Sequence, residues 1–214
     1  MIKENLCFLC GSNKNQPISG PLQRSYRKCL NCGLVYVTRE FFISEKEARR
    51  RYLKHENTPD SIGYTEFLRK AVNPVLPFIE RGSKALDFGC GHQPVLAGIL
   101  ESLGVECDYY DPLFFPEGIK KTSYDFIFST ETFEHFQNPA REISLIYSLL
   151  ARGGYLSVMT KFLDSEINFS SWHYAMDSTH LIFYGTQVFS YIAEKWNFSI
   201  FYMDSESLVV FKKE

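Results

Sequence analysis

The sequence contains no long apolar run, and its first residues have no apolar centre. None of its 214 residues belongs to a stretch approaching the roughly 18 to 20 apolar residues that a membrane-spanning helix requires. Residues 1–10, MIKENLCFLC, also lack the apolar core of a secretory signal peptide. We therefore expect a cytoplasmic protein without a membrane partner.

The sequence also lacks a strong excess of either charge, but its charges are unevenly distributed. The net charge is −2, and the 45% apolar and 22% charged residues are ordinary for a globular protein. Residues 1–55 contain 11 lysines and arginines against 4 acidic residues, whereas residues 56–214 contain 12 against 21. This contrast predicts a small module over 1–55 and a larger domain over 56–214.

The basic residues of the first module show no pattern that favours nucleic acid. Residues 48–54 follow a capping-box pattern at Ser44 and Glu47, which predicts a charged helix. Three arginines stand together in this segment, at positions 49 to 51, and no aromatic stacking pattern accompanies them. A solvated helix face is therefore the preferred interpretation, with a nucleic-acid patch as the alternative.

Four of the six cysteines form two C-x2-C pairs in the first module, Cys7 with Cys10 and Cys29 with Cys32. The 18 residues between the pairs lie within the range of a structural zinc site. Four thiolates close a tetrahedral shell around Zn²⁺, so the metal is predicted to be structural. Two disulfides are the alternative, which an intracellular chain does not favour. The sequence thus predicts a small N-terminal zinc ribbon.

Residues 84–100, KALDFGCGHQPVLAGIL, predict a buried strand, a glycine turn and a helix. Asp87 is the only charge near the end of the apolar strand, and apolar residues from position 95 onward recur at helical spacing. A unit of this kind forms a ligand crevice at the carboxyl end of a strand in an open α/β sheet. Gly89 and Gly91 allow a ligand to approach the backbone.

The turn lacks the third glycine of a dinucleotide-binding fingerprint. His92-Gln93-Pro94 occupies the helix start instead, which is a poor cradle for a pyrophosphate. The next predicted strand, 105–110, ends in Asp111-Pro112, and a carboxylate at that position commonly binds ribose hydroxyls. A nucleoside ligand without phosphates satisfies both observations, and S-adenosylmethionine is the obvious candidate.

The remaining pattern completes a doubly wound α/β domain. Further strands are expected over 124–129, 155–160, 198–203 and 208–212, and helices over 64–81, 139–150 and 186–196. Pro74 and Pro77 should kink or split the first of these helices. The last two strands are short and close in sequence, so we expect a mostly parallel sheet with a reversed last strand.

Together these segments resemble the class I S-adenosylmethionine-dependent methyltransferases, which have a Rossmann-like fold. The matching motifs are LDFGCG (86–91), YYDP (109–112), YDFIFSTETFEHFQNP (124–139) and LLARGGYLSVMT (149–160). The closer likeness is to the group with an N-terminal zinc-binding module, which includes sugar C-methyltransferases. WHYAMDSTHLIFYG (172–185) is similar to a signature of that group. Gln93 replaces the third glycine of the family, so the start of the following helix is expected to be displaced.

The resemblance implies a set of cofactor-binding residues. The glycine turn would line the methionine part of the cofactor, Asp111 would bind the ribose, and the tip of the strand over 124–129 would face the sulfonium. The residues predicted to bind the cofactor are Tyr64, Asp87, Phe88, Gly89, Cys90, Gly91, Asp111, Pro112, Thr130 and Glu131. His55 and Asn57 are further candidates that would approach the cofactor from above.

Methyl transfer to an O, N or C acceptor also requires in-line placement and a base. The predicted catalytic residues are Glu131, His135, His173, Tyr174 and His180. The histidines could equally bond to backbone or seal a loop against the core. The run Glu131-x-x-Glu134-His135 also resembles the metal-binding segment of quinone-precursor O-methyltransferases, so a second metal, Mg²⁺ or Zn²⁺, is a lesser alternative.

Three functions fit these observations. The preferred one is methylation of a small molecule, for example a sugar or a secondary-metabolite intermediate. The second is methylation of RNA or protein docked on the basic ribbon, which the acidic larger domain disfavours. The third is a non-catalytic cofactor-binding scaffold, which has no need of several histidines in one crevice. The sequence does not identify the acceptor, the base or the oligomeric state.

Overall fold

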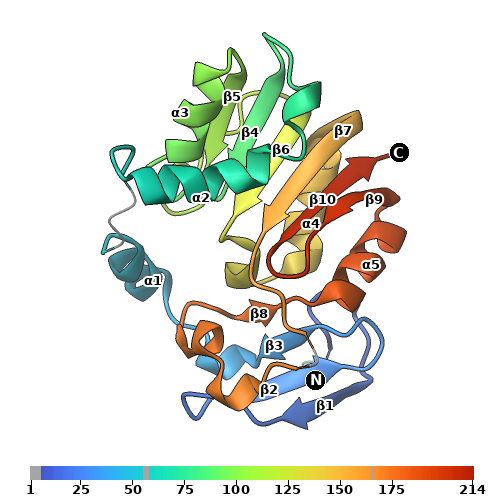
Figure 1. The fold of residues 1–214 in the computed structure, drawn as a ribbon. Coiled ribbons are helices and arrows are strands. Elements are labelled where there is room, and N and C mark those ends of the chain that lie inside the picture. The colour runs from blue at the N-terminus through green and yellow to red at the C-terminus, as the bar shows by residue number, and fades with distance from the viewer. Residues whose placement is uncertain (1–5, 55–57, 165) are drawn as a thin grey trace.

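The chain folds into a layered α/β domain with a smaller antiparallel sheet beside it (Figure 1). The computed structural model describes residues 6–54, 58–164 and 166–214. The predicted boundary between residues 55 and 56 and the candidates His55 and Asn57 lie outside this part of the chain. Within the described residues, no helix combines the length and apolar character needed to cross a membrane.

The main sheet has six strands in the order β5-β4-β6-β7-β10-β9. Its strands are β4 (Lys84–Phe88), β5 (Glu106–Tyr110), β6 (Tyr124–Thr130), β7 (Leu150–Met159), β9 (Phe198–Met203) and β10 (Leu208–Lys213). The first four in this order are parallel, and β10 is antiparallel to both of its neighbours. The predicted mostly parallel sheet with a reversed last strand is therefore confirmed.

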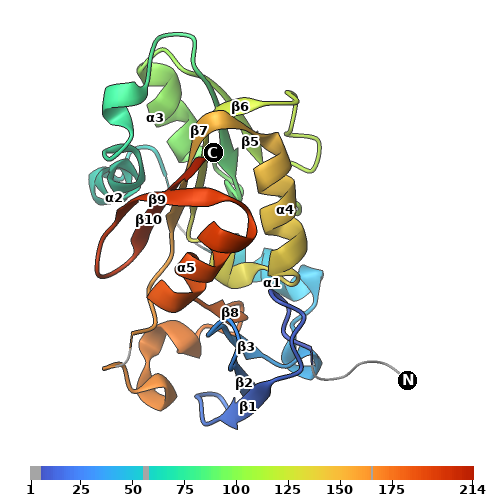
Figure 2. The same cartoon turned by 90° about the vertical axis from the view of Figure 1, so that its right-hand side faces the viewer.

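Helices cover both faces of this sheet, as Figure 2 shows from its edge. One face carries α2 (Ile62–Val72) and α3 (Val95–Ser102), and the other carries α4 (Pro139–Leu149) and α5 (Thr186–Lys195). The two resulting apolar cores lie on opposite sides of β4, because Ala85 belongs to one and Leu86 to the other. This is the doubly wound architecture expected from the sequence.

Two element boundaries follow the sequence-based expectation, and one differs from it. Prolines split the segment over 64–81 into α2 and the short 3-10 helix Leu76–Phe78, as predicted. The strand expected to begin at residue 155 already begins at Leu150. The Gly153-Gly154 pair is an irregularity inside this strand. Gly153 adopts a φ of 78°, and the pairing register with β6 shifts at this level. Helix α3 starts only at Val95, in line with the displaced start expected from Gln93.

The second sheet joins the N-terminal module to a distant segment. It contains β1 (Asn15–Ile18), β2 (Tyr26–Cys29), β3 (Val35–Val37) and β8 (Ile182–Phe183), all antiparallel. Strand β8 comes from the connection between β7 and α5, and it lies beside β3 in Figure 1. The predicted charged helix is α1 (Glu45–Tyr52), and the Ser44 side chain accepts the expected hydrogen bond from the Glu47 N–H.

Candidate active site

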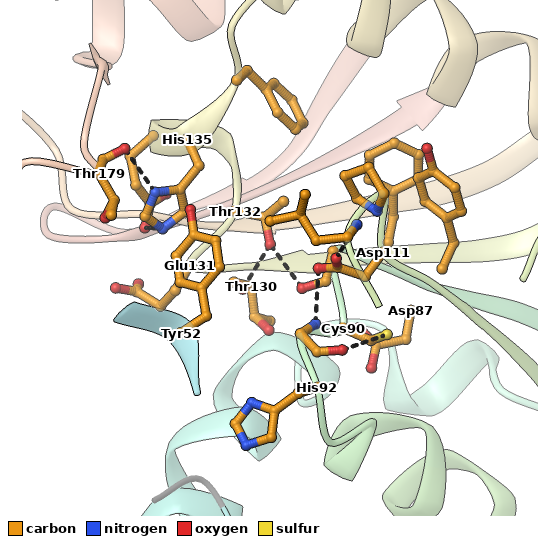
Figure 3. Close-up of a pocket in the computed structure, with 18 of the residues that line it drawn as sticks. Tyr52, Asp87, Cys90, His92, Asp111, Thr130, Glu131, Thr132, His135 and Thr179 are labelled. Carbon is orange, nitrogen blue, oxygen red and sulfur yellow. Dashed lines mark hydrogen bonds and ion pairs between the residues drawn. The ribbon is translucent and has the colours of Figure 1, made fainter. Parts of the chain in front are cut away.

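A cavity of about 700 Å³ opens at the carboxyl ends of β4, β5 and β6. Its volume falls within the range of small-molecule sites, and its place is where open α/β sheets bind ligands. Residues of α1 and α2 also line it. Figure 3 shows Tyr52 and His135 grouped on one side of the cavity and Asp87, Cys90 and Asp111 on the other. We refer to these as the histidine side and the glycine-turn side.

The glycine turn is held by neighbouring strands in a conformation that favours glycine. Gly89 and Gly91 have φ angles of 84° and 65°. The N–H groups of Gly89 and Cys90 donate to the Tyr110 carbonyl at 2.7 and 3.1 Å. A Cβ atom on Gly89 would collide with Thr132, whereas one on Gly91 would meet open space. Gly91 therefore presents bare backbone to the cavity.

Thr132 ties this turn to the tip of β6, and the sequence analysis did not single it out. Its hydroxyl lies 3.2 Å from the Gly89 carbonyl and 3.0 Å from the Thr130 carbonyl, and it can donate to either. The glycine turn and the tip of β6 are thus joined by one side chain. The only available signal was the position of Thr132 two residues beyond a predicted strand, which many loop residues share.

Asp111 lies against the glycine turn, as the sequence predicted. Its Oδ2 accepts a hydrogen bond from the Gly91 N–H at 3.1 Å. Its Oδ1 accepts from the N–H groups of Leu113 and Phe114 at 2.8 and 3.2 Å. A carboxylate offers about four lone-pair positions, so one further hydrogen bond can be accepted through Oδ2. Asp111 therefore shapes the turn and keeps a position for a ligand.

Acidic groups give the glycine-turn side a negative character. Asp87 is 2% exposed, and burial raises the pKa of its carboxyl to about 7. Tyr64 of α2 lines the cavity beside it, and burial raises the pKa of that phenol to about 12. A buried carboxyl of this kind is stabilised in its charged form by a cation. This side of the cavity is therefore suited to a positively charged ligand.

Glu131 occupies the tip of β6 in a strained conformation. Its φ is 48°, and its N–H donates to the Met159 carbonyl at 2.7 Å. Left-handed backbone is uncommon for a residue other than glycine and is concentrated at functional sites. Burial, together with the charge of Glu134, raises the pKa of the Glu131 carboxyl to about 8. This carboxyl can therefore hold or release a proton near neutral pH.

Two histidines face the cavity with one ring nitrogen each bound to backbone. His135 Nδ1 lies 2.9 Å from the Thr179 carbonyl, and His180 Nδ1 lies 2.6 Å from the Tyr174 carbonyl. Because a carbonyl oxygen only accepts, each Nδ1 carries a proton, so Nε2 is the nitrogen of each ring that can accept a proton or bind a ligand. The two ring centres are 4.9 Å apart.

Two of the predicted catalytic residues do not line the cavity. Both lie in the 3-10 helix His173–Met176, in which Tyr174 and Ala175 are buried and the two end residues are exposed. His173 is exposed to solvent on the outer side. Tyr174 is buried, and its hydroxyl lies 3.1 Å from the Thr160 hydroxyl. Tyr174 therefore supports the site from behind, and His173 is placed away from any ligand in the cavity.

Tyr52 lines the cavity although the sequence analysis treated its helix as a solvated face. Its ring packs edge-on against His135, with the ring centres 5.3 Å apart. Burial raises the pKa of the Tyr52 phenol, and the charge of Glu134 adds to this effect. Glu45 and Ala48 of the same helix also line the cavity. Helix α1 thus covers the histidine side.

Comparison with known protein families identifies the family to which the chain belongs. A family model described as a methyltransferase domain matches residues 61–202, which includes the glycine turn, Asp111 and both histidines. The chain belongs to this methyltransferase family. The prediction of an S-adenosylmethionine-dependent methyltransferase of class I is confirmed at this level. No curated protein matches the sequence.

Solved structures share the fold of this methyltransferase at low identity. One is the Burkholderia thailandensis 1,6-didemethyltoxoflavin-N1-methyltransferase with bound 1,6-didemethyltoxoflavin and S-adenosylhomocysteine. It is 11% identical, with a TM-score of 0.56, and the match covers 92% of this chain and 99% of that one. A methyltransferase from Archaeoglobus fulgidus is 19% identical, with a TM-score of 0.50 and coverages of 69% and 94%. One from Mesorhizobium loti is 12% identical, with a TM-score of 0.50 and coverages of 73% and 100%.

All ten residues that the sequence predicted to bind the cofactor line the cavity of the methyltransferase. They are Tyr64, Asp87, Phe88, Gly89, Cys90, Gly91, Asp111, Pro112, Thr130 and Glu131. His92 and Gln93, which the altered glycine pattern had left open, line it as well. Of the predicted catalytic residues, the cavity brings together Glu131, His135 and His180.

The N-terminal module positions the histidine side of the methyltransferase through one buried arginine. The guanidinium of Arg24 donates hydrogen bonds to four backbone carbonyls of the segment 175–180. These are the carbonyls of Ala175 at 2.6 Å, His180 at 3.1 Å, Asp177 at 3.2 Å and Ser178 at 3.3 Å. The fifth N–H donates to the Tyr26 hydroxyl at 2.9 Å. All five donors of the guanidinium are therefore used.

The four cysteines of the two C-x2-C pairs converge in the same module. All four Sγ atoms lie within 4.8 Å of one another. The Sγ atoms of Cys7 and Cys32 are 3.6 Å apart, and those of Cys10 and Cys29 are 3.5 Å apart. The Zn–S bond of about 2.3 Å places two ligands of a tetrahedral site about 3.8 Å apart. The cluster thus has the size of a four-thiolate zinc site.

Proposed function

We propose that this methyltransferase uses S-adenosylmethionine to methylate a small molecule that binds beneath α1. The observation that carries the proposal is the division of one cavity into two chemically different sides. Bare glycine backbone, Asp87 and Asp111 form one side, and Glu131 with the two histidines forms the other. The first suits a nucleoside that carries positive charge, and the second suits an acceptor that loses a proton.

The glycine-turn side fits the donor. When bound, S-adenosylmethionine supplies a methyl group on a positively charged sulfonium. Asp111 keeps one accepting position for a ribose hydroxyl, and Gly91 leaves the backbone open to the methionine part. The buried carboxyl of Asp87, with its raised pKa, is stabilised in its charged form by the ammonium group of the donor.

The histidine side fits a small acceptor. Helix α1 and the segment that contains Asp177, Thr179 and His180 enclose it. Glu131, whose carboxyl has a pKa of about 8, is the group on this side that we assign to take a proton from the acceptor. The Burkholderia thailandensis enzyme, which shares the fold, has a small molecule bound together with S-adenosylhomocysteine. This supports a small-molecule acceptor for the present chain as well.

The arginines of the basic module give no support to docking of RNA. Arg24 is buried, and Arg49 packs over the ring of Phe114. Arg50 and Arg51 form ion pairs with Glu47 on their own helix. These positive charges are engaged within the chain. A salt-sensitive RNA-binding surface requires cations that are free to displace counterions from phosphates.

Calorimetric titration of S-adenosylhomocysteine into the purified chain tests the donor site. We expect one binding site per chain. Asp111→Asn should weaken binding at least about tenfold, or 1.4 kcal/mol, whereas Glu106→Gln, at the exposed start of the preceding strand β5, should not. A wild-type chain that binds neither S-adenosylhomocysteine nor S-adenosylmethionine would overturn the proposal.

Transfer of a labelled methyl group from S-adenosylmethionine tests the acceptor class. A cell extract is separated into low-mass, RNA and protein fractions, and each is incubated with the enzyme. Label in the low-mass fraction alone is the expected result. Label confined to RNA or protein would contradict a small-molecule acceptor while leaving the donor site intact.

We also propose that Cys7, Cys10, Cys29 and Cys32 hold a structural Zn²⁺. The convergence of the four Sγ atoms supports this, as do the glycines that follow each pair, Gly11 and Gly33, with φ angles of 72° and 81°. Left-handed glycines let the chain turn back toward the sulfurs. Elemental analysis should find one zinc bound to this cluster. Cys29→Ser should remove it, whereas Cys107→Ser should not.

A further inference from the structure

A second group of metal-ligand atoms meets on the histidine side of the cavity. One ligand atom each from Glu134, His135 and His180 lies within 4.8 Å of the others. Glu134 and His135 come from the 3-10 helix Phe133–His135 after β6, and His180 precedes β8, so the fold brings them together over 45 residues. Glu131, which the sequence placed in a possible metal set, is not part of this group. We propose that Glu134, His135 and His180 bind a divalent transition-metal ion that holds an oxygen atom of the methyl acceptor.

The two histidines are oriented as metal ligands usually are. Each donates its Nδ1 proton to a backbone carbonyl, His135 to Thr179 and His180 to Tyr174. This contact fixes the ring and leaves the Nε2 lone pair directed away from the backbone. Metal-binding histidines almost always have such a partner on their other nitrogen.

Glu134 supplies an anionic oxygen without a partner. The residue is fully buried, and its Oε2 accepts a hydrogen bond from the Thr160 hydroxyl at 2.9 Å. Its Oε1 has no hydrogen-bond partner among the residues that the structure describes. His135 Nε2 is 3.9 Å from this oxygen, too far for a hydrogen bond. A buried acceptor left unpaired destabilises the folded chain, and a bound cation would offset this cost.

The donor set selects the class of metal. Two imidazole nitrogens and one carboxylate oxygen suit Zn²⁺, Fe²⁺, Co²⁺ or Mn²⁺, whereas Mg²⁺ and Ca²⁺ prefer oxygen ligands throughout. Three protein ligands also leave coordination positions open. All three residues line the cavity, so an acceptor there can reach these positions. The acceptor is therefore an oxygen-bearing small molecule, such as a hydroxyl or enol compound. This last step rests on the proposed methyltransferase function.

Manganese binding separates this site from the cysteine cluster. Mn²⁺ has little affinity for a four-thiolate site, so equilibrium dialysis against Mn²⁺ of a chain loaded with a single equivalent of Zn²⁺, which the four thiolates bind, reports the second site alone. We expect one Mn²⁺ per chain, with affinity at least tenfold weaker in Glu134→Gln and in His180→Gln. His173→Gln is the matched control, because His173 is exposed nearby and lies outside the cavity, and it should bind Mn²⁺ like the wild type.

Titration with S-adenosylhomocysteine keeps the metal proposal distinct from the proposed function. Each variant should retain its affinity for this product, which shows that it is folded and that the donor site is intact. If Glu134→Gln fails to fold, His180→Gln and His135→Gln provide the same comparison. A wild-type chain that binds S-adenosylhomocysteine but no Mn²⁺, Co²⁺ or second Zn²⁺ would overturn the metal site alone. So would folded variants that bind Mn²⁺ as tightly as the wild type.

Discussion

The guanidinium of Arg24 donates a hydrogen bond to the carbonyl oxygen of His180 at 3.1 Å, across 156 positions of sequence. The same guanidinium holds three further carbonyls of the segment 175–180. This segment carries Thr179, whose carbonyl fixes the ring of His135. The N-terminal module therefore determines the geometry of the histidine side, although the glycine-turn side is built wholly by the larger domain.

Replacement of Arg24 by lysine should damage the histidine side selectively. Lysine offers three donors at one point in place of five in a planar fork, so at least two buried acceptors lose their partner. We expect the free energy of unfolding to fall by on the order of 2–4 kcal/mol. Methyl transfer should fall more than the affinity for S-adenosylhomocysteine.

Chemical denaturation, calorimetry and a methyl-transfer assay measure these three quantities. Arg27→Lys is the control, because Arg27 lies close to Arg24 in the sequence, on β2, and donates to the Asn15 side chain near the surface. Equal losses of donor affinity and methyl transfer in Arg24→Lys would show that the arginine acts only through general stability.

The sequence predicted the parts of this site that depend on local patterns. The strand, turn and helix around Gly89 follow from periodicity and from glycine, and the carboxylate at Asp111 follows from the end of a strand. The cysteine cluster follows from spacing. Strand β8 has only two residues, Ile182–Phe183, so it has no period to read. Its pairing with β3 is a tertiary contact that a local pattern does not reveal. The sequence therefore did not show that His180, just before β8, lines the cavity while His173 does not.

Tyr52 and Thr132 escaped the sequence analysis for a related reason. Tyr52 belongs to a helix that has no fully buried residue, so its pattern indicates a solvated face. Helix α1 covers the cavity because the cavity opens at the ends of the sheet strands next to it. This is a tertiary relationship that the pattern of the helix does not reveal. Thr132 is one polar residue in a loop, and its importance comes from its contact with Gly89.

Gly89→Ala should be more damaging to the fold than Gly91→Ala. Both positions have left-handed φ angles, so both substitutions introduce backbone strain on the order of 1 kcal/mol. At Gly89 the new methyl group would also collide with the side chain of Thr132. A double-mutant cycle with Thr132→Ala measures this contact, because the substitution removes the Cγ2 and Oγ1 atoms that lie nearest the new methyl group and leaves only Cβ.

We expect Thr132→Ala to restore part of the stability lost in Gly89→Ala and none of that lost in Gly91→Ala. Denaturation midpoints of the wild type, the three single variants and the two double variants provide the comparison. Additive effects of Gly89→Ala and Thr132→Ala would show that the glycine is required for its φ angle alone.

Asp87 should make the ligand-free protein less stable as the pH rises. Its pKa in the folded chain is about 7, against 3.8 for an exposed carboxyl. Below about pH 4 the group is protonated in both states. Between about pH 4 and about pH 7 the Asp87 carboxyl loses its proton in the unfolded chain but keeps it in the folded chain, so stability is lost as the pH rises. Above about pH 7 the loss is complete.

Asp87→Asn removes this titration. The variant should match the wild type near pH 4 and be more stable at pH 8, by on the order of 2–4 kcal/mol. Its affinity for S-adenosylmethionine should nevertheless fall, because the charge that faces the donor's ammonium group is gone. Thermal denaturation from pH 4 to 8 without ligand tests the first part. A stability difference that does not change with pH would contradict a raised pKa.

Tyr52→Ala should weaken acceptor binding and leave donor binding unchanged. The Tyr52 ring contacts His135 edge-on, and α1 lines the cavity on this side without taking part in the glycine turn. Loss of the ring opens the histidine side to water. Methyl transfer should therefore fall at low acceptor concentration and recover as the concentration of the low-mass fraction rises. The affinity for S-adenosylhomocysteine should stay within about twofold, well under the 1.4 kcal/mol of a tenfold change.

Arg50→Ala, on the exposed face of the same helix, is the matched control. Donor affinity that falls together with acceptor binding would mean that α1 covers the whole cavity, and the division into two sides would then no longer hold.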